Sequence, residues 1–119
     1  VEYFEHKTVM AAFAKGQSLL DVPEYKVNAS RRDAAGQAEV HARETDVIYV
    51  VGGQATFVTG GTVLDGKQTA PFETRGRGID GGEVRKLAKG DVVVVPNGTP
   101  HWFRDVAGTF DYFVVKVID

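Results

Sequence analysis

The stretch Gly90-Asp-Val-Val-Val-Val-Pro96-Asn-Gly98-Thr-Pro-His101-Trp-Phe-Arg-Asp105 combines a run of valines, a Pro/Asn-Gly turn and a histidine. Consecutive valines are typical of a buried β-strand, and proline followed by Asn-Gly is typical of a tight turn. His101 then lies among the first residues of the next strand. We therefore expect an imidazole at the mouth or in the interior of a β-barrel, held there by a rigid turn.

A second stretch, Glu39-Val-His41-Ala-Arg-Glu-Thr-Asp46-Val-Ile-Tyr-Val-Val-Gly-Gly53, holds another histidine between carboxylates. Side chains alternate between the two faces of a strand, so Glu39 and His41 point to the same side. Asp46 has the wrong parity for one continuous strand, but a turn at residues 43–45 would re-phase the chain and bring it opposite His41. We therefore expect four potential metal ligands to converge, namely Glu39, His41, Asp46 and His101.

The composition of the chain limits its class. Its 119 residues have the size of one domain, so we take residues 1–119 as a single domain. The 14 glycines and short β-branched runs favour an all-β barrel or sandwich. A formal net charge of -2 argues against nucleic-acid binding, and no apolar run is long enough to span a bilayer. Cysteine is absent, which excludes thiolate ligands, and the compartment stays open between cytoplasm and periplasm.

The local patterns predict one short N-terminal helix followed by strands. Thr8–Lys15 is the helix, and Gly16 is suited to end it. Asp46–Val51 and Ala55–Thr59 are predicted to form a hairpin around Gly52-Gly53. Residues 60–82 are rich in glycine and are expected to be the least ordered. The other strands are expected at residues 25–32, 38–43, 84–87, 92–95, 101–106 and 110–117, which together indicate an antiparallel barrel.

The chemistry of the four expected ligands points to a metal. Two imidazoles with one or two carboxylates match the ligand set of non-haem Fe(II) sites that keep open positions. Two carboxylates in a partly desolvated barrel repel each other, and a divalent cation would relieve that repulsion. We therefore expect a divalent transition metal (Fe, Mn, Zn or Ni) as cofactor, with one of the carboxylates, Glu39 or Asp46, left to act as general base.

The two stretches resemble the two motifs of the cupin family. Gly90-x5-Pro96-x-Gly98-x2-His101-x3 matches the second motif, except that Asp105 replaces the usual asparagine. Glu39-x-His41-x4-Asp46-x6-Gly53 is similar to the first motif, with Glu39 in place of a histidine and Asp46 in place of a glutamate. The resemblance covers about residues 38–117 and implies a double-stranded β-helix (jelly-roll) barrel, usually dimeric, with a transition metal near its axis.

Several of these residues have a second interpretation. Asp46 is also consistent with a turn residue, and Glu39 with an exposed carboxylate on an edge strand. Arg43 would either meet an anionic substrate or be a solvated turn residue. Arg75 and Arg77 would either close over a carboxylate-bearing ligand or belong to an ordinary loop. Trp102 is expected to face outward, and the apolar lining of a pocket would come from Ile48, Val50, Phe57, Phe103, Tyr112 and Val114, most of it barrel core.

The sequence leaves more than one function open. We expect a metal-dependent enzyme, of dioxygenase, lyase or isomerase type, that acts on a small organic molecule in the barrel. The alternatives are a cupin that binds a small ligand or a metal without catalysis, and a structural barrel with a vestigial site. The expected partners are a small-molecule ligand and a second copy of the chain, in a homodimer. The strand around Tyr25–Ser30 is expected to contribute to this dimer by extending the neighbour's sheet.

Overall fold

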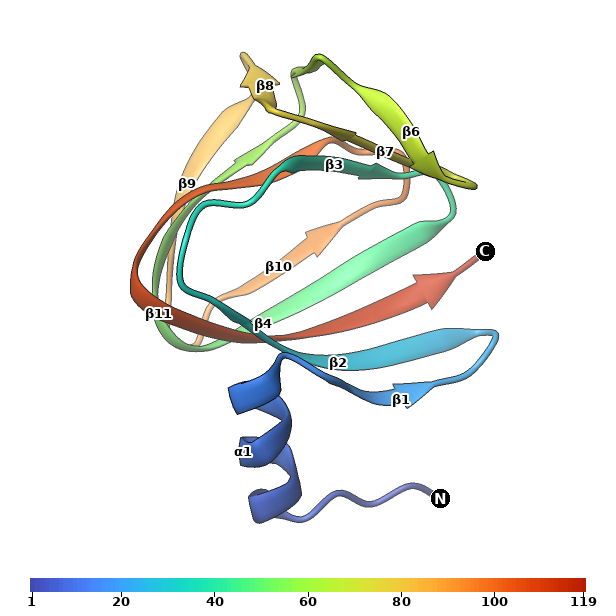
Figure 1. Ribbon diagram of the computed structural model, residues 1–119, viewed down its shortest axis with the longest axis vertical. Helices are drawn as coiled ribbons and strands as arrows, with labels where there is room; N and C mark the ends of the chain where they lie inside the picture. Colours follow the sequence, from blue (N-terminus) through green and yellow to red (C-terminus); the bar gives the residue numbers. More distant parts are fainter.

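The computed structural model describes residues 1–119, which form one short helix and eleven strands. Figure 1 shows the strands curving around a common interior, with the helix outside them. The elements are α1 (His6–Lys15), β1 (Ser18–Asp21), β2 (Tyr25–Arg32), β3 (Ala38–His41), β4 (Glu44–Thr59), β5 (Thr62–Leu64), β6 (Lys67–Ala70), β7 (Glu73–Gly76), β8 (Gly78–Asp80), β9 (Glu83–Ala88), β10 (Val92–Val95) and β11 (His101–Ile118).

The two longest strands, β4 and β11, organise the fold by pairing antiparallel along most of their length. From β11 the sheet continues through β2 to β1, and in the other direction through β3 and β7 to β6. The other edge of β4 pairs with β10 in its first half and with β9 in its second half. The hydrogen-bonded path ends at β1 and β6, so the wall is a curved, open sheet. This all-β arrangement with one short helix confirms the predicted fold class.

The hairpin predicted around Gly52-Gly53 is wrong, because Asp46–Val51 and Ala55–Thr59 both belong to the single strand β4. Likewise, the two strands expected at residues 101–106 and 110–117 are one strand, β11, whose register with β4 shifts between Ala107 and Asp111. The irregular places of the two strands lie together: Gly53 has a φ of 86°, and a Cβ at Gly53 would overlap the carbonyl oxygen of Thr109. The glycines therefore allow both strands to bend while they stay paired.

Two other expectations about the strands need correction. Residues 60–82, expected to be the least ordered, contain β5 to β8; β7 pairs with β3, and β5 pairs with β8. The strand expected around Tyr25–Ser30 is present as β2, but β1 and β11 of the same chain occupy both of its edges. It cannot extend the sheet of a neighbour, because the outer edge on that side belongs to β1.

Helix α1 begins at His6, two residues before the predicted start, and ends at Lys15 as predicted. Gly16 follows it in the left-handed conformation, and its N–H donates to carbonyl oxygens of the last turn. Ala12 and Phe13 are buried against Ala29 of β2, so the helix covers the outer face of that strand. The structure has no helix of sufficient length and apolar character to cross a membrane.

The main hydrophobic core fills part of the interior between the bent strands. Its aromatic rings contact one another, with 4.6 Å between the ring centroids of Phe57 and Phe103 and 5.1 Å between those of Phe103 and Tyr112. Trp102 points to the opposite face of β11, as expected, and packs against the small cluster of Ala38, Val58 and Ile79. The core consists of Ile48, Val50, Ala55, Phe57, Leu87, Val95, Phe103, Phe110, Tyr112 and Val114.

Candidate metal centre and its cavity

The structure brings the two sequence motifs side by side. Glu39 of β3 lies directly opposite His101 of β11 in the sheet, and His41 shares the face of Glu39 because side chains alternate along β3. The turn before His101 is also bonded to the turn after His41. Asn97 donates its side-chain N–H to the carbonyl oxygen of Ala42 at 3.1 Å. The two motifs therefore form one unit, although 60 residues separate the histidines.

Three of the four expected ligands form one group. Glu39, His41 and His101 each offer a ligand atom, and these atoms lie within 4.8 Å of one another. Both histidines are buried, with 7% of the surface of His41 and 4% of that of His101 exposed, and their ring centroids are 5.1 Å apart. Two imidazole nitrogens and one carboxylate oxygen suit a first-row divalent metal, and this donor set leaves coordination positions open. The residues present therefore fit the metal that the cupin resemblance implies.

The surroundings of His101 prepare its Nε2 atom for metal binding. Nδ1 lies 3.0 Å from the carbonyl oxygen of Thr99, which can only accept a hydrogen bond, so Nδ1 carries the proton. Nε2 is then the unprotonated nitrogen. Burial lowers the pKa of His101, and the Thr99 carbonyl and the charge of Asp46 offset this only in part. A neutral imidazole oriented by a hydrogen bond on its other nitrogen is the form that metals bind.

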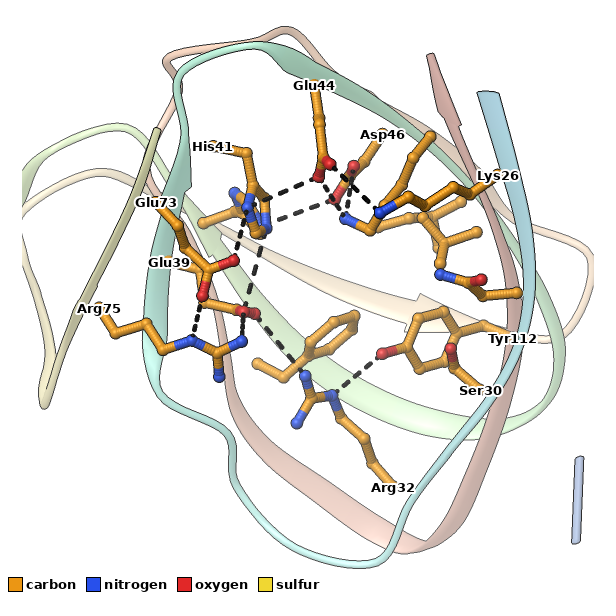
Figure 2. Close-up of a pocket in the computed structure, with 16 residues that line it drawn as sticks. Lys26, Ser30, Arg32, Glu39, His41, Glu44, Asp46, Glu73, Arg75 and Tyr112 are labelled. Carbon is orange, nitrogen blue, oxygen red and sulfur yellow. Dashed lines mark hydrogen bonds and ion pairs between the residues drawn. The ribbon is translucent and has the colours of Figure 1, made fainter. Parts of the chain in front are cut away.

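His41 lies among three carboxylates. Its Nε2 is 3.9 Å from a carboxylate oxygen of Glu39, within the ligand group. On the other side of the ring, Nδ1 faces Glu44 at 3.8 Å and Glu73 at 3.7 Å, as Figure 2 shows. Both distances are too long for hydrogen bonds, so Glu44 and Glu73 act on this side of the ring through their charge, while Nε2 faces the ligand group.

Asp46 reaches the same cavity but stands outside the ligand group. A turn after β3 re-phases the chain, but it lies at residues 42–43 and not at 43–45, and Asp46 is paired with Val95 and Lys116 and not placed opposite His41. Asp46 Oδ2 lies 3.7 Å from Nε2 of His101. Its closer partner is Lys116, whose ammonium group donates to Asp46 Oδ1 at 2.9 Å. Burial acts to lower the pKa of Lys116, but Asp46 and Glu44 outweigh it and the net pKa is raised. The carboxylate charge expected to need a metal is therefore already balanced by a lysine.

Glu39 has cationic neighbours of its own. Arg75 Nη2 lies 3.1 Å from Glu39, and Arg75 Nε donates to Glu73 at 2.6 Å. Burial alone would raise the pKa of Glu73, but the hydrogen bond and charge of Arg75 outweigh it and the pKa is lowered. The predicted repulsion between two unpaired carboxylates is thus absent: the chain supplies its own counter-charges, which sequence reasoning did not foresee.

The ligand group lies in the wall of a cavity of about 270 Å³, which Figure 2 shows in close-up. Ile48, Phe103, Tyr112 and Val114 line it, as the sequence predicted, and these same residues form the face of the core that borders the cavity. Val50 and Phe57, which were also expected to line a pocket, are fully buried in the core and do not reach it. Only four of the sixteen lining residues are hydrophobic, so the cavity is polar.

The three arginines that the sequence analysis named as possible ligand contacts lie in different places. Arg75 lines the cavity beside Glu39, whereas Arg77 is exposed and paired with Asp65. Arg43 lies outside the cavity: its guanidinium group stacks over the ring of Phe72, 4.8 Å from the centroid, beside a second hollow of about 220 Å³. Arg43 therefore does not line the main cavity, and its contact with an anionic substrate at the barrel mouth stays a prediction, because the second hollow is also lined by His41.

Sequence reasoning missed a group of polar residues in the cavity wall. Strand β2 presents every second residue to the cavity, from Lys26 to Arg32, and Glu44 and Lys116 face it from β4 and β11. An alternation of polar residues with Val27 and Ala29 was the available signal. The missed lining residues are Lys26, Asn28, Ser30, Arg32, Glu44, Glu73 and Lys116.

Comparisons with solved structures support the fold. A Bacillus halodurans protein is 10% identical, with a TM-score of 0.71, covering 100% of this chain and 83% of its own. The cupin domain of Schizosaccharomyces pombe Cnp3 is 12% identical, with a TM-score of 0.62, covering 87% of this chain and 60% of its own. A cupin family protein of Methanocaldococcus jannaschii is 13% identical, with a TM-score of 0.58, covering 87% of this chain and 78% of its own. At these identities the likeness concerns the fold alone.

The family assignment comes from a sequence comparison over nearly the whole chain. The family model described as "Cupin" matches residues 7–117. The match begins well before residue 38, so it includes helix α1 and strands β1 and β2 as well as both motifs. Among curated proteins, no sequence matches this chain. This protein belongs to the cupin family.

Proposed function

We propose that this cupin is a metal-dependent enzyme that acts on a small polar organic molecule bound in its cavity. The observation that carries the proposal is the group of Glu39, His41 and His101, whose ligand atoms lie within 4.8 Å of one another in the wall of that cavity. This donor set is suited to Fe, Mn, Zn or Ni and leaves room for a substrate atom beside the metal. The cavity, at about 270 Å³, suits a molecule below the size of typical drug-like ligands.

The chemistry divides between the metal and the chain. A metal bound by these three residues supplies Lewis acidity, for a lyase or isomerase reaction, or dioxygen chemistry, for a dioxygenase reaction. The chain orients the substrate and moves protons. Burial raises the pKa of Tyr112, so its hydroxyl stays protonated at neutral pH and can donate a hydrogen bond to a substrate oxygen. Tyr112 also accepts a hydrogen bond from Arg32 at 3.1 Å, which holds its hydroxyl in place.

The general base in this proposal is Asp46. With Glu39 used as a ligand, Asp46 is the remaining carboxylate of the motif, and it lies 3.7 Å from His101 at the edge of the ligand group. Lys116 fixes its orientation through a hydrogen bond of 2.9 Å. A base in this position lies next to the residues that would hold the metal, where it could take a proton from a substrate bound in the cavity.

Matched variants test the two carboxylate roles separately. Glu39→Gln should lose bound metal, whereas Asp46→Asn should keep the metal and lose turnover. Untagged protein would be loaded with Fe, Mn, Zn or Ni, its metal content measured, and a panel of small hydroxy acids, keto acids and sugars assayed. The proposal fails if both variants keep full metal occupancy and the wild-type protein turns over no compound with any of the four metals.

A second candidate function is binding without catalysis, and one observation favours it. Asp46 is only 4% exposed and is bonded to Lys116, which leaves it less free to accept a proton from a substrate. Tight binding of a ligand that is recovered chemically unchanged, in the presence of each metal, would favour this function over the enzyme.

A further inference from the structure

Strand β2 has its polarity reversed relative to an ordinary barrel strand. Ala29, on the outer face, is fully buried by Ala12 and Phe13 of helix α1. The inner face, which usually carries apolar residues, carries only polar ones. A strand with this pattern lines a cavity that holds water or a polar molecule. The inner residues are Lys26, Asn28, Ser30 and Arg32.

The two cations on the inner face of β2 are paired more loosely than the other two cations in the cavity. Lys26 is 4.0 Å from Glu44, and Arg32 is 3.9 Å from Glu39, both too long for a hydrogen bond. By contrast, Arg75 and Lys116 lie 2.6 Å and 2.9 Å from their nearest carboxylate oxygens. Lys26 and Arg32 therefore keep donors that a ligand can use.

Arg32 is also held in a fixed position. Its Nε donates to the Tyr112 hydroxyl at 3.1 Å, and its guanidinium group lies over the ring of Phe103, 4.8 Å from the centroid. Its Nη2 is left facing Glu39 across the cavity at 3.9 Å, as Figure 2 shows, while Nη1 lies beside Gly36. A guanidinium group fixed through Nε and its planar face is suited to bind an oxyanion with its remaining N–H groups.

The cavity, whose side-chain charges balance, becomes positively charged when a divalent metal binds. Four acidic side chains line it (Glu39, Glu44, Asp46 and Glu73), and four basic ones balance them (Lys26, Arg32, Arg75 and Lys116). Neutral histidines add nothing, so a divalent cation leaves the cavity with an excess of positive charge. Excess charge in a partly buried site is unfavourable unless it is compensated. A negatively charged ligand provides that compensation.

We propose that the cavity binds a small hydroxylated organic oxyanion, a carboxylate or a phosphate ester, whose negative group contacts Arg32 at one end of the inner face of β2. Its oxygens at the other end contact Lys26, and those in between face Glu39, His41 and His101. Asn28 and Ser30, between the two cations on β2, are placed to bond its hydroxyl groups. This inference names the substrate class of the proposed function, and it rests on that function because it includes metal binding at Glu39. Glu39 belongs to the metal group and also faces Arg32 at 3.9 Å, so a metal that neutralises Glu39 leaves the charge of Arg32 to the ligand, and the two binding events strengthen each other.

Calorimetric titration of untagged, zinc-loaded protein tests this proposal with defined probes. L-malate represents the carboxylates and glucose 6-phosphate the phosphate esters, while erythritol and glucose are their uncharged counterparts. We expect one or both anions to bind, and the neutral compounds to bind at least about tenfold more weakly, because charged hydrogen bonds are the stronger ones. Zinc content measured after each titration excludes removal of the metal by the probe.

Variants on the two faces of β2 provide the matched control. Arg32→Gln and Lys26→Gln should each weaken anion binding by about tenfold, the loss expected for charge-assisted hydrogen bonds. Arg31→Gln should leave it unchanged, because Arg31 lies on the outer face and pairs with Asp111 at 2.8 Å. Thermal unfolding shows whether Arg32→Gln is folded; if it is not, Lys26→Gln carries the test.

The outcomes separate this inference from the proposed function. Three results would overturn the inference alone. The protein could bind zinc stoichiometrically but neither anion, or the neutral probes could bind as tightly as the anions. In the third case, Arg32→Gln and Lys26→Gln would both keep the anion affinity of the wild type. Anion binding that depends on Arg32 in a protein that holds no metal would support the anion site and overturn the metal-dependent function.

Discussion

The backbone N–H of Gly98 donates a hydrogen bond to the carbonyl oxygen of His41, with 2.8 Å between nitrogen and oxygen. Gly98 belongs to the turn that aims His101, so this bond connects the backbones that carry the two imidazoles. Its φ of 79° lies in the left-handed region, which glycine adopts without strain. Gly98 thus helps to position both histidines through its backbone, although it has no side chain.

The same turn predicts an effect of Asn97 on metal binding. Asn97→Ala removes the bond to the Ala42 carbonyl and leaves all the ligands in place. We expect Zn²⁺ binding to weaken by roughly fivefold, the equivalent of the about 1 kcal/mol that one hydrogen bond contributes. Calorimetry measures the affinity. Ser18→Ala is the control, because it removes a similarly exposed bond to Leu20 in β1; equal zinc affinities in both variants would show that the turn does not position the site.

The buried pair of Asp46 and Lys116 predicts an order of stabilities. Lys116→Met leaves the Asp46 carboxylate, with 6% of its side chain exposed, without its partner. The free energy of unfolding should fall by about 3 kcal/mol, because an unpaired buried charge is strongly destabilising. The double variant Asp46→Leu/Lys116→Met should be more stable than Lys116→Met alone. Urea unfolding of metal-free protein measures both, and a double variant less stable than the single one would contradict this account of the pair.

The lowered pKa of His101 predicts a loss of stability in acid. Because burial holds the pKa below its ordinary value of 6.5, the unfolded chain takes up this proton at a higher pH than the folded protein. The contribution of His101 is therefore complete above pH 6.5 and is lost as the pH falls from there toward the folded pKa. Urea unfolding of metal-free protein across this range should show a smaller pH dependence for His101→Gln. His6→Gln, at an exposed position, should follow the wild-type curve; an unchanged slope in His101→Gln would refute the assignment.

The elements that sequence predicted well depend on local chemistry. Gly16 ends the helix, and the turn around Asn97 places His101. Both follow from local chemistry, because proline narrows and glycine widens the range of backbone conformations at its own position. Gly52-Gly53 misled for the same reason. A glycine pair between apolar runs is typical of a hairpin, and only the distant pairing of β4 with β11 makes it a bend.

The counter-charges in the cavity were beyond local reasoning. Asp46 and Lys116 are 70 residues apart in the sequence, and Glu39 meets Arg75 only because β3 pairs with β7. The identity of the ligand group could be predicted from motif spacing and strand parity. Which carboxylate joined it could not, because both have a cationic partner and the choice depends on which one the tertiary structure places beside both imidazoles.

A twofold dimer remains a prediction, and the exposed edge of β10 is where we expect its contact. β10 pairs only with β4, and its Val92 and Val94 are 61% and 57% exposed, next to the half-exposed Tyr49. Light scattering should give twice the mass of one 12.9 kDa chain. Val92→Thr/Val94→Thr should shift the protein toward monomer, because it removes apolar contact but keeps strand preference.

The control for the dimer is Val117→Thr, at a position 46% exposed on another strand, which should leave the mass unchanged. A wild-type monomer at micromolar concentration would refute the dimer, and a dimer that persists in the double variant would place its contact elsewhere.

The central claim, that His41 and His101 hold one metal with Glu39, is tested most directly by calorimetric zinc titration of untagged protein. We expect one zinc per chain, and affinity lower by at least about a hundredfold in His41→Ala and in His101→Ala, since loss of outer-shell contacts alone weakens metal sites by 10–100-fold. His6→Ala should bind as the wild type does. A wild-type protein that binds no zinc, or histidine variants that bind it undiminished, would contradict the account.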